Sequence, residues 1–124
     1  MNERRVETRL LCAELVEINW KDKSARQRRR VVNLEDISLS GACLQSEMPI
    51  LRGTAVTIRY GDGELVGSVR YCLYRDLGYF LGIEFAPDCR WSTKHFRPRH
   101  LLDPKRLVDR AARRTKPASV REAS

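Results

Sequence analysis

Short apolar segments separated by tight-turn sequences are the feature that most constrains the fold of this chain. Segments rich in alternating or β-branched residues occur at 10–18, 31–37, 42–45, 54–60, 64–74 and 79–85. Turn-forming sequences lie between several of them, at 38–41, 61–63 and 76–78. Six or seven strands at such short spacing predict an all-β fold, either an antiparallel barrel or a closed sandwich, because closure removes exposed strand edges.

Two segments fit the strand pattern poorly. Glu14 falls on the same face of its strand as Cys12 and Val16, which makes that alternation imperfect. Residues 21–30 are dense in charge, and we expect a hairpin loop there, with strand pairing resuming near Arg28.

Length and cysteine spacing exclude several classes of protein. A chain of 124 residues fits one domain, and no apolar run is long enough to cross a bilayer. The charged start, residues 1–5, does not resemble a signal peptide, so we expect a cytoplasmic protein without membrane insertion. The four cysteines form no CxxC pair, so no metal site is expected, and Cys12, Cys43 and Cys72 are interpreted as apolar fillers on strands.

The C-terminal third carries all of the excess positive charge. Residues 1–89 hold 13 Lys and Arg against 13 Asp and Glu, whereas residues 90–124 hold 11 against 3. Asp103-Pro104 is typical of a helix start and predicts a helix at about 104–114, followed by a disordered end. Trp91 and Phe96 are expected to dock this basic segment onto the barrel. The simplest interpretation of this positive charge is a solvated helix face. The charge would also suit binding to an acidic partner, nucleic acid or anionic lipid.

Two clusters carry chemistry suited to a nucleotide. The first is Arg4, Arg5 and Arg9, whose guanidinium groups can bind phosphate oxygens or a guanine edge and can stack on a purine. The second is Asp36-x-Ser38-x-x-Gly41, in which the carboxylate can accept hydrogen bonds from guanine. Each cluster alone also has an ordinary explanation. The arginines could simply be solubilising charge, and the segment from Asp36 to Gly41 could be a common turn.

Together the clusters resemble the two-part signature of PilZ domains. Arg5-x-x-x-Arg9, 26 intervening residues and Asp36-x-Ser38-x-x-Gly41 match that signature, and the segments 67–72 and 78–85 resemble the last two strands of the family's barrel. The resemblance covers about residues 3–88. It implies a six-stranded antiparallel PilZ-like β-barrel at 3–89, followed by the basic segment 90–124 with its α-helix.

The resemblance also implies cyclic di-GMP (c-di-GMP) as the ligand. A flexible segment at 1–9 would place Arg5 and Arg9 as a clamp, while Asp36, Ser38 and Gly41 would hold a guanine. Arg4 offers a third guanidinium, which in the family allows a stacked ligand dimer, and a ligand-dependent protein dimer is left open.

The predicted function is therefore a bacterial c-di-GMP sensor or adaptor that signals to a separate, unidentified effector protein. It would need no cofactor and would perform no catalysis, because neither His95 nor His100 neighbours a constellation of nucleophile and carboxylate in the sequence. One alternative is a degenerate PilZ-like protein-interaction domain without a ligand. A basic nucleic-acid binder is a weaker alternative, because the basic segment holds few aromatic residues.

Overall fold

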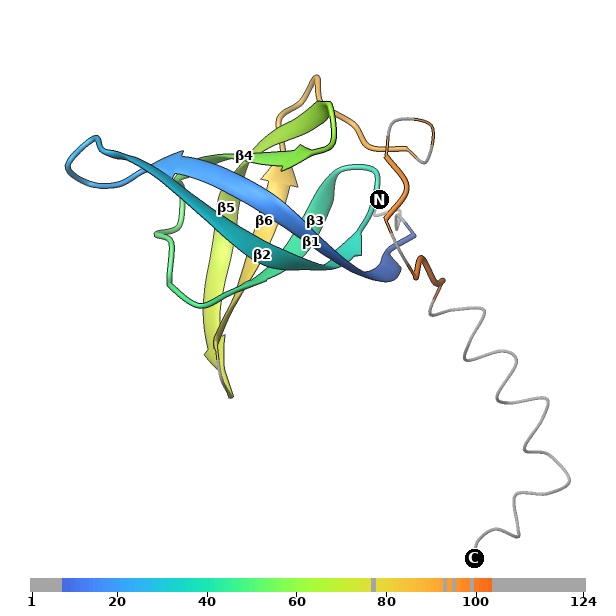
Figure 1. Cartoon of the computed structure of the whole chain (residues 1–124), viewed down its shortest axis with the longest axis horizontal. Coiled ribbons are helices and arrows are strands. Elements are labelled where there is room, and N and C mark those ends of the chain that lie inside the picture. Colours follow the sequence, from blue (N-terminus) through green and yellow to red (C-terminus); the bar gives the residue numbers. More distant parts are fainter. Residues whose placement is uncertain (1–7, 77, 93, 95, 99, 104–124) are drawn as a thin grey trace, which may run out of the picture.

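The computed structural model is a closed barrel of six antiparallel strands (Figure 1). It describes residues 8–76, 78–92, 94, 96–98 and 100–103. The strands, in chain order, are β1 (Leu10–Lys21), β2 (Gln27–Ile37), β3 (Gly41–Ser46), β4 (Ala55–Tyr60), β5 (Gly63–Arg75) and β6 (Gly78–Phe85). Around the barrel they follow the order β1-β2-β3-β6-β5-β4, and β4 pairs again with β1. The predicted six-stranded barrel is confirmed.

Alternation along the strands fills the barrel with aliphatic side chains. On β1 the buried positions are Val16, Ile18 and Trp20, whereas the residues between them are partly exposed. The other strands contribute in the same way, and the largest fully buried side chains are Ile18, Leu34, Ile37, Leu44, Ile58, Leu81, Val56 and Val69. Burial of this apolar surface is the main force that stabilises the barrel.

The charged segment 21–30 forms a hairpin, as predicted, and strand pairing resumes at Gln27, next to the predicted Arg28. Pairing between β1 and β2 continues to Lys21 and Gln27, which leaves a short turn at 22–26. Asp22 closes this turn, because its Oδ1 accepts hydrogen bonds from the backbone N–H groups of Ser24 and Arg26, both at 2.9 Å. Backbone pairing and this turn therefore hold the strands together without apolar alternation.

Two β-bulges change which side chains of β2 and β5 face outward. On β2 the register shifts between Leu34 and Asp36, so Ile37 enters the core and Asp36 faces outward. On β5 it shifts between Val69 and Tyr71, so Tyr71 faces outward with 41% of its surface exposed. A bulge adds one residue to one strand and so reverses the facing of the residues beyond it.

The segment after β6 packs against the barrel, as predicted for Trp91 and Phe96. Trp91 is buried, its indole N–H donates to the Phe96 carbonyl at 2.8 Å, and the Phe96 ring stacks on Tyr60 with centroids 4.2 Å apart. Leu102 then exchanges two backbone hydrogen bonds with Leu11, at 2.7 and 2.8 Å. The segment is thereby anchored to the start of β1.

Several predictions fall on residues outside the described part of the chain. These include Arg4 and Arg5, His95, and the helix at 104–114 with its disordered end. Within the described residues, no helix is long and apolar enough to cross a membrane.

Candidate functional site

Arg9 and Asp36, one residue from each predicted cluster, are in direct contact. Nη1 of Arg9 donates to Oδ1 of Asp36 at 2.5 Å, although the two residues are 27 positions apart. Arg9 lies immediately before β1, and antiparallel pairing places Leu11 opposite Asp36. The bulge on β2 turns the carboxylate outward, so the barrel brings the arginine segment to the carboxylate.

Ser38 and Gly41 form the turn between β2 and β3. The backbone N–H of Ser38 donates to the Gly41 carbonyl at 2.8 Å, and its hydroxyl donates to the same oxygen at 3.3 Å. A Cβ at Gly41 would lie 2.5 Å from the Ile83 carbonyl oxygen, so only glycine lets β3 approach β6 this closely. These two residues thus build the turn, and both also line a cleft beside Arg9.

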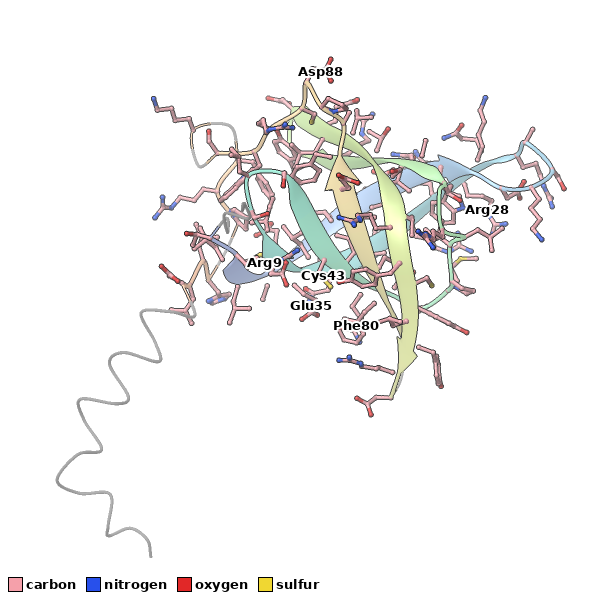
Figure 2. All side chains as sticks on the ribbon, turned by 180° about the vertical axis from the view of Figure 1, so that it is seen from behind. Arg9, Arg28, Glu35, Cys43, Phe80 and Asp88 are labelled. Atoms are coloured by element: carbon pink, nitrogen blue, oxygen red, sulfur yellow. The ribbon has the colours of Figure 1, made fainter. Side chains whose placement is uncertain are left out.

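A row of outward-facing positions crosses four strands from Asp36. Asp36 pairs with Cys43 on β3, Cys43 with Gly82 on β6, and Gly82 with Tyr71 on β5. The Tyr71 ring covers Gly82 closely: a Cβ at Gly82 would lie 2.0 Å from Cε2 of Tyr71. The Tyr71 hydroxyl also hydrogen-bonds the Cys43 thiol. Figure 2 shows Arg9 and Cys43 on this side of the barrel.

A cleft of about 600 Å³ adjoins this row and is lined by two of its members, Gly82 and Tyr71. Its lining includes Arg9 and Ser38 at one end and Arg52, Arg70 and Tyr71 toward the other. Such a volume falls within the usual range of small-molecule sites.

The charges of the cleft favour an anion. Arg9, Arg52 and Arg70 contribute guanidinium groups, whereas Glu84 is the one carboxylate among the described lining residues. Glu84 lies 3.7 Å from Arg70, and both side chains are more than half exposed. Arg52 has no ion-pair partner within the part of the chain that the structure describes. A ligand with two phosphates and aromatic bases would complement this arrangement.

The thiols near the site remain protonated at neutral pH. Burial raises the pKa of the Cys43 thiol to about 11 and that of Cys12 to about 12, and the nearby Asp36 carboxylate acts in the same direction. All four cysteines are free. Cys12 and Cys72 lie on strands and pack against the core, as predicted, whereas Cys43 is buried on the outward-facing row. No group of three or more His, Cys, Asp or Glu able to hold a metal occurs among the described residues.

Sequence reasoning named Arg9, Asp36, Ser38 and Gly41, and the structure brings these four together. Arg5 and Arg4 lie outside the described residues. The sequence did not predict the far end of the cleft, which is lined by Arg52, Arg70 and Tyr71. The one available signal was Gly82, because a glycine inside a strand often marks a close approach by another group.

The fold resembles that of solved PilZ domains. A PilZ domain with c-di-GMP of YcgR from Escherichia coli is similar with a TM-score of 0.52 and 16% identity, over 68% of this chain and 79% of that one. The K. pneumonia MrkH–c-di-GMP complex is similar with a TM-score of 0.53 and 17% identity, over 94% of this chain and 57% of that one. This chain thus spans little more than half the length of MrkH.

These similarities establish the fold of the chain and confirm the PilZ-like barrel that the sequence predicted. No protein-family model matches the sequence, and no curated protein gives a significant match.

Proposed function

We propose that this chain is a c-di-GMP receptor that binds the dinucleotide between its N-terminal arginine segment and the row from Asp36 to Tyr71. The observation that carries this proposal is the contact between Arg9 and Asp36 at the edge of a cationic cleft. The PilZ-like fold supports it, because the similar PilZ domain of YcgR was solved with c-di-GMP.

Asp36 is the proposed guanine acceptor. Its outward-facing carboxylate can accept hydrogen bonds from the ring N–H and the amino group of guanine, while Ser38 and Gly41 hold the adjacent turn in place. The ion pair with Arg9 does not prevent this role, because 52% of the Arg9 side chain is exposed. An exposed ion pair contributes about 0–1 kcal/mol, so ligand contacts can replace it at little cost.

Arg9 and Arg5 are the proposed clamp, with Arg4 as a third guanidinium. Once released from Asp36, Arg9 remains close enough to the cleft to bind a phosphate in bidentate fashion. Ordering of residues 1–9 over the ligand would change the surface offered to an effector protein, which is a common form of molecular switch.

Tyr71 extends the proposed site along the row. Its ring lies over Gly82 and offers an aromatic face on which a base can stack, while Arg70 and Arg52 lie within reach of a phosphate. None of these groups attacks or activates a bond, because the nearest thiol, Cys43, is protonated and buried. The proposed function is therefore binding and signalling without catalysis, in the cytoplasm where c-di-GMP is present.

Calorimetric titration of the full chain with c-di-GMP tests this proposal. We expect micromolar or tighter binding, lost in Arg5→Ala/Arg9→Ala and weakened at least about fivefold in Asp36→Ala, since each bidentate contact contributes about 1–3 kcal/mol. Arg26→Ala/Arg30→Ala is the matched control, because it removes two exposed arginines from the hairpin and should leave binding unchanged. Absence of binding by a folded chain would refute the receptor and favour a ligand-free interaction domain.

A further inference from the structure

A second cleft lies at the hairpin end of the barrel, away from the nucleotide site. It encloses about 640 Å³ between the β1–β2 hairpin and the loop that joins β3 to β4. The hairpin side includes Trp20, Lys21, Lys23 and Arg28, and the loop side includes Met48, Ile50 and Leu51. Figure 2 shows Arg28 and Arg9 at opposite ends of the barrel, so the two clefts are distinct.

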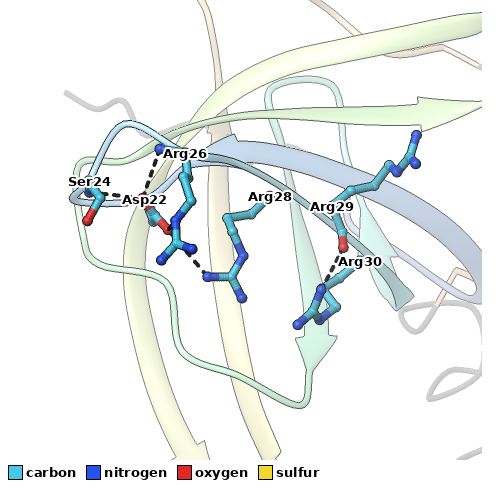
Figure 3. A network of polar contacts seen from close by, with 6 residues as sticks. All are labelled: Asp22, Ser24, Arg26, Arg28, Arg29 and Arg30. Atoms are coloured by element: carbon cyan, nitrogen blue, oxygen red, sulfur yellow. Dashed lines mark hydrogen bonds and ion pairs between the residues drawn. The ribbon is translucent and has the colours of Figure 1, made fainter.

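The hairpin is an isolated concentration of positive charge. Residues 21–30 hold six of the 13 Lys and Arg of residues 1–89 but one of the 13 Asp and Glu. That carboxylate, Asp22, is used within the turn, where it accepts two backbone N–H groups and pairs with Arg28 at 3.3 Å (Figure 3). Backbone hydrogen bonds from Arg26 and the other contacts lower the pKa of Asp22, so it stays ionised and engaged.

Two exposed lysines at the rim of this cleft are available to pair with a partner's carboxylates. Lys21 and Lys23 are exposed, and neither has an ion-pair partner among residues that the structure describes. Arg29, by contrast, pairs with Glu17 at 3.2 Å. Because hydrogen bonds to Asp22 close the turn, the lysines are presented from a preformed hairpin and little ordering is required on binding.

The floor of this cleft is apolar. Trp20 and Ile50 lie beneath it with 6% and 3% of their surface exposed, while Leu51 projects from the loop with 58% exposed. Such a combination of buried apolar floor, projecting leucine and cationic rim matches a segment with both apolar and acidic side chains.

Charge and shape distinguish among the molecules that could bind in this second cleft. The chain's own C-terminal segment holds 11 basic residues against 3 acidic ones, and like charges would repel it from the hairpin. Nucleic acid would need an exposed aromatic face for stacking, which Trp20 does not offer, and its phosphates gain nothing from an aliphatic floor. An anionic membrane surface would likewise present headgroup phosphates to the lysines but no apolar side chains to the cleft.

We propose that this cleft docks an acidic segment of a partner protein. Apolar side chains of that segment pack on Trp20, Ile50 and Leu51, and its carboxylates pair with Lys21 and Lys23. This docking site does not depend on the nucleotide site, so each can fail without the other.

Selection from short random peptides tests the chemistry of the partner. Phage-displayed peptides are selected on the immobilised full chain and counter-selected on Lys21→Glu/Lys23→Glu. We expect enrichment of peptides that combine Asp or Glu with Leu, Ile or Phe. The leading peptide is then titrated into ¹⁵N-labelled protein, where we expect shifts of the Trp20 indole N–H and of amides at 21–28 and 48–51.

Matched variants locate the binding. Lys21→Glu/Lys23→Glu and Leu51→Asp should each weaken the leading peptide about tenfold or more, and neither disturbs the core because all three side chains are exposed. Lys94→Glu/Arg97→Glu reverses two exposed charges elsewhere and should have no effect.

Three results would overturn the proposal. The first is enrichment of peptides without acidic residues, or of none at all. The second is equal weakening by the two double charge reversals, which would indicate general electrostatic attraction. The third is a thymidine oligonucleotide or phosphatidylglycerol vesicles moving the same resonances at lower concentration than any peptide.

Discussion

Two glycines of the barrel offer a test that separates folding from binding. At Gly41 an added Cβ would lie 2.5 Å from the backbone oxygen of Ile83, whereas at Gly82 it would lie 2.0 Å from the ring of Tyr71. Backbone within a closed barrel cannot move away easily, but a ring that is 41% exposed can swing outward. We therefore expect Gly41→Ala to destabilise the fold and Gly82→Ala chiefly to disturb the ligand cleft.

The expected magnitudes follow from these contacts. Overpacking between β3 and β6 should lower the free energy of unfolding of Gly41→Ala by about 1–3 kcal/mol. A loss near 2 kcal/mol corresponds to a decrease in Tm of roughly 10 °C for a domain of this size. Gly82→Ala loses the hydrogen bond from Tyr71 to Cys43 and the ring's contact with the strand, which together should cost about 1 kcal/mol or less.

The effect of Gly82→Ala on binding should be larger than its effect on stability. Displacing the Tyr71 ring removes a stacking surface that contributes about 1–3 kcal/mol per base, so c-di-GMP should bind at least fivefold more weakly. Tyr71→Ala should reproduce this loss, and Tyr71→Phe should retain most of the affinity.

Urea unfolding and calorimetric titration of the same preparations provide the comparison, and Tyr74→Ala, at an exposed tyrosine that does not line the cleft, serves as the control. The reasoning is refuted if Gly82→Ala is the less stable of the two glycine variants, or if it binds c-di-GMP like the parent.

Other predictions follow from single contacts. Arg9→Ala should change the free energy of unfolding by less than about 1 kcal/mol, because the lost ion pair is exposed; a larger change in urea unfolding would give Arg9 a structural role. Trp91→Ala should cost about 3–5 kcal/mol by the same measurement, since it removes a buried indole that anchors the segment after β6. Burial raises the pKa of the Cys43 thiol from 9.0 to about 11, so between these pH values the unfolded state binds fewer protons than the folded state and stability falls as pH rises. Cys43→Ala should show a shallower fall than the parent between pH 9.0 and about 11, and an unchanged slope would contradict the raised pKa.

Strand positions could be predicted because most strands bury one face and expose the other. The segments at 54–60 and 79–85 follow this rule, and that at 31–37 follows it as far as Leu34; these segments match β4, β6 and β2 of the barrel. The hairpin at 21–30 breaks it, because these strands project beyond the pairing with β4, which ends at Trp20. Their side chains are solvated, so only turn chemistry and backbone pairing specify the structure there.

The bulges explain why only half of the candidate site was visible in the sequence. Simple alternation from Leu34 would place Asp36 in the core, and alternation from Val69 would place Tyr71 there as well. Each bulge reverses the facing, so both side chains lie on one outward-facing row, with Cys43 and Gly82 between them. Local sequence does not encode a bulge, because it depends on the partner strand. Asp36 was therefore identified by its motif, and Tyr71 was missed.

The most direct test of the account is an NMR titration of the ¹⁵N-labelled full chain with c-di-GMP. We predict saturable shifts confined to amides around Arg9, at 36–41, at Arg52, Arg70 and Tyr71, and at Gly82, with the hairpin at 21–30 unaffected. Shifts centred on that hairpin, or no shifts in a folded protein, would contradict the assignment of the cleft between Arg9 and Tyr71 as the nucleotide site.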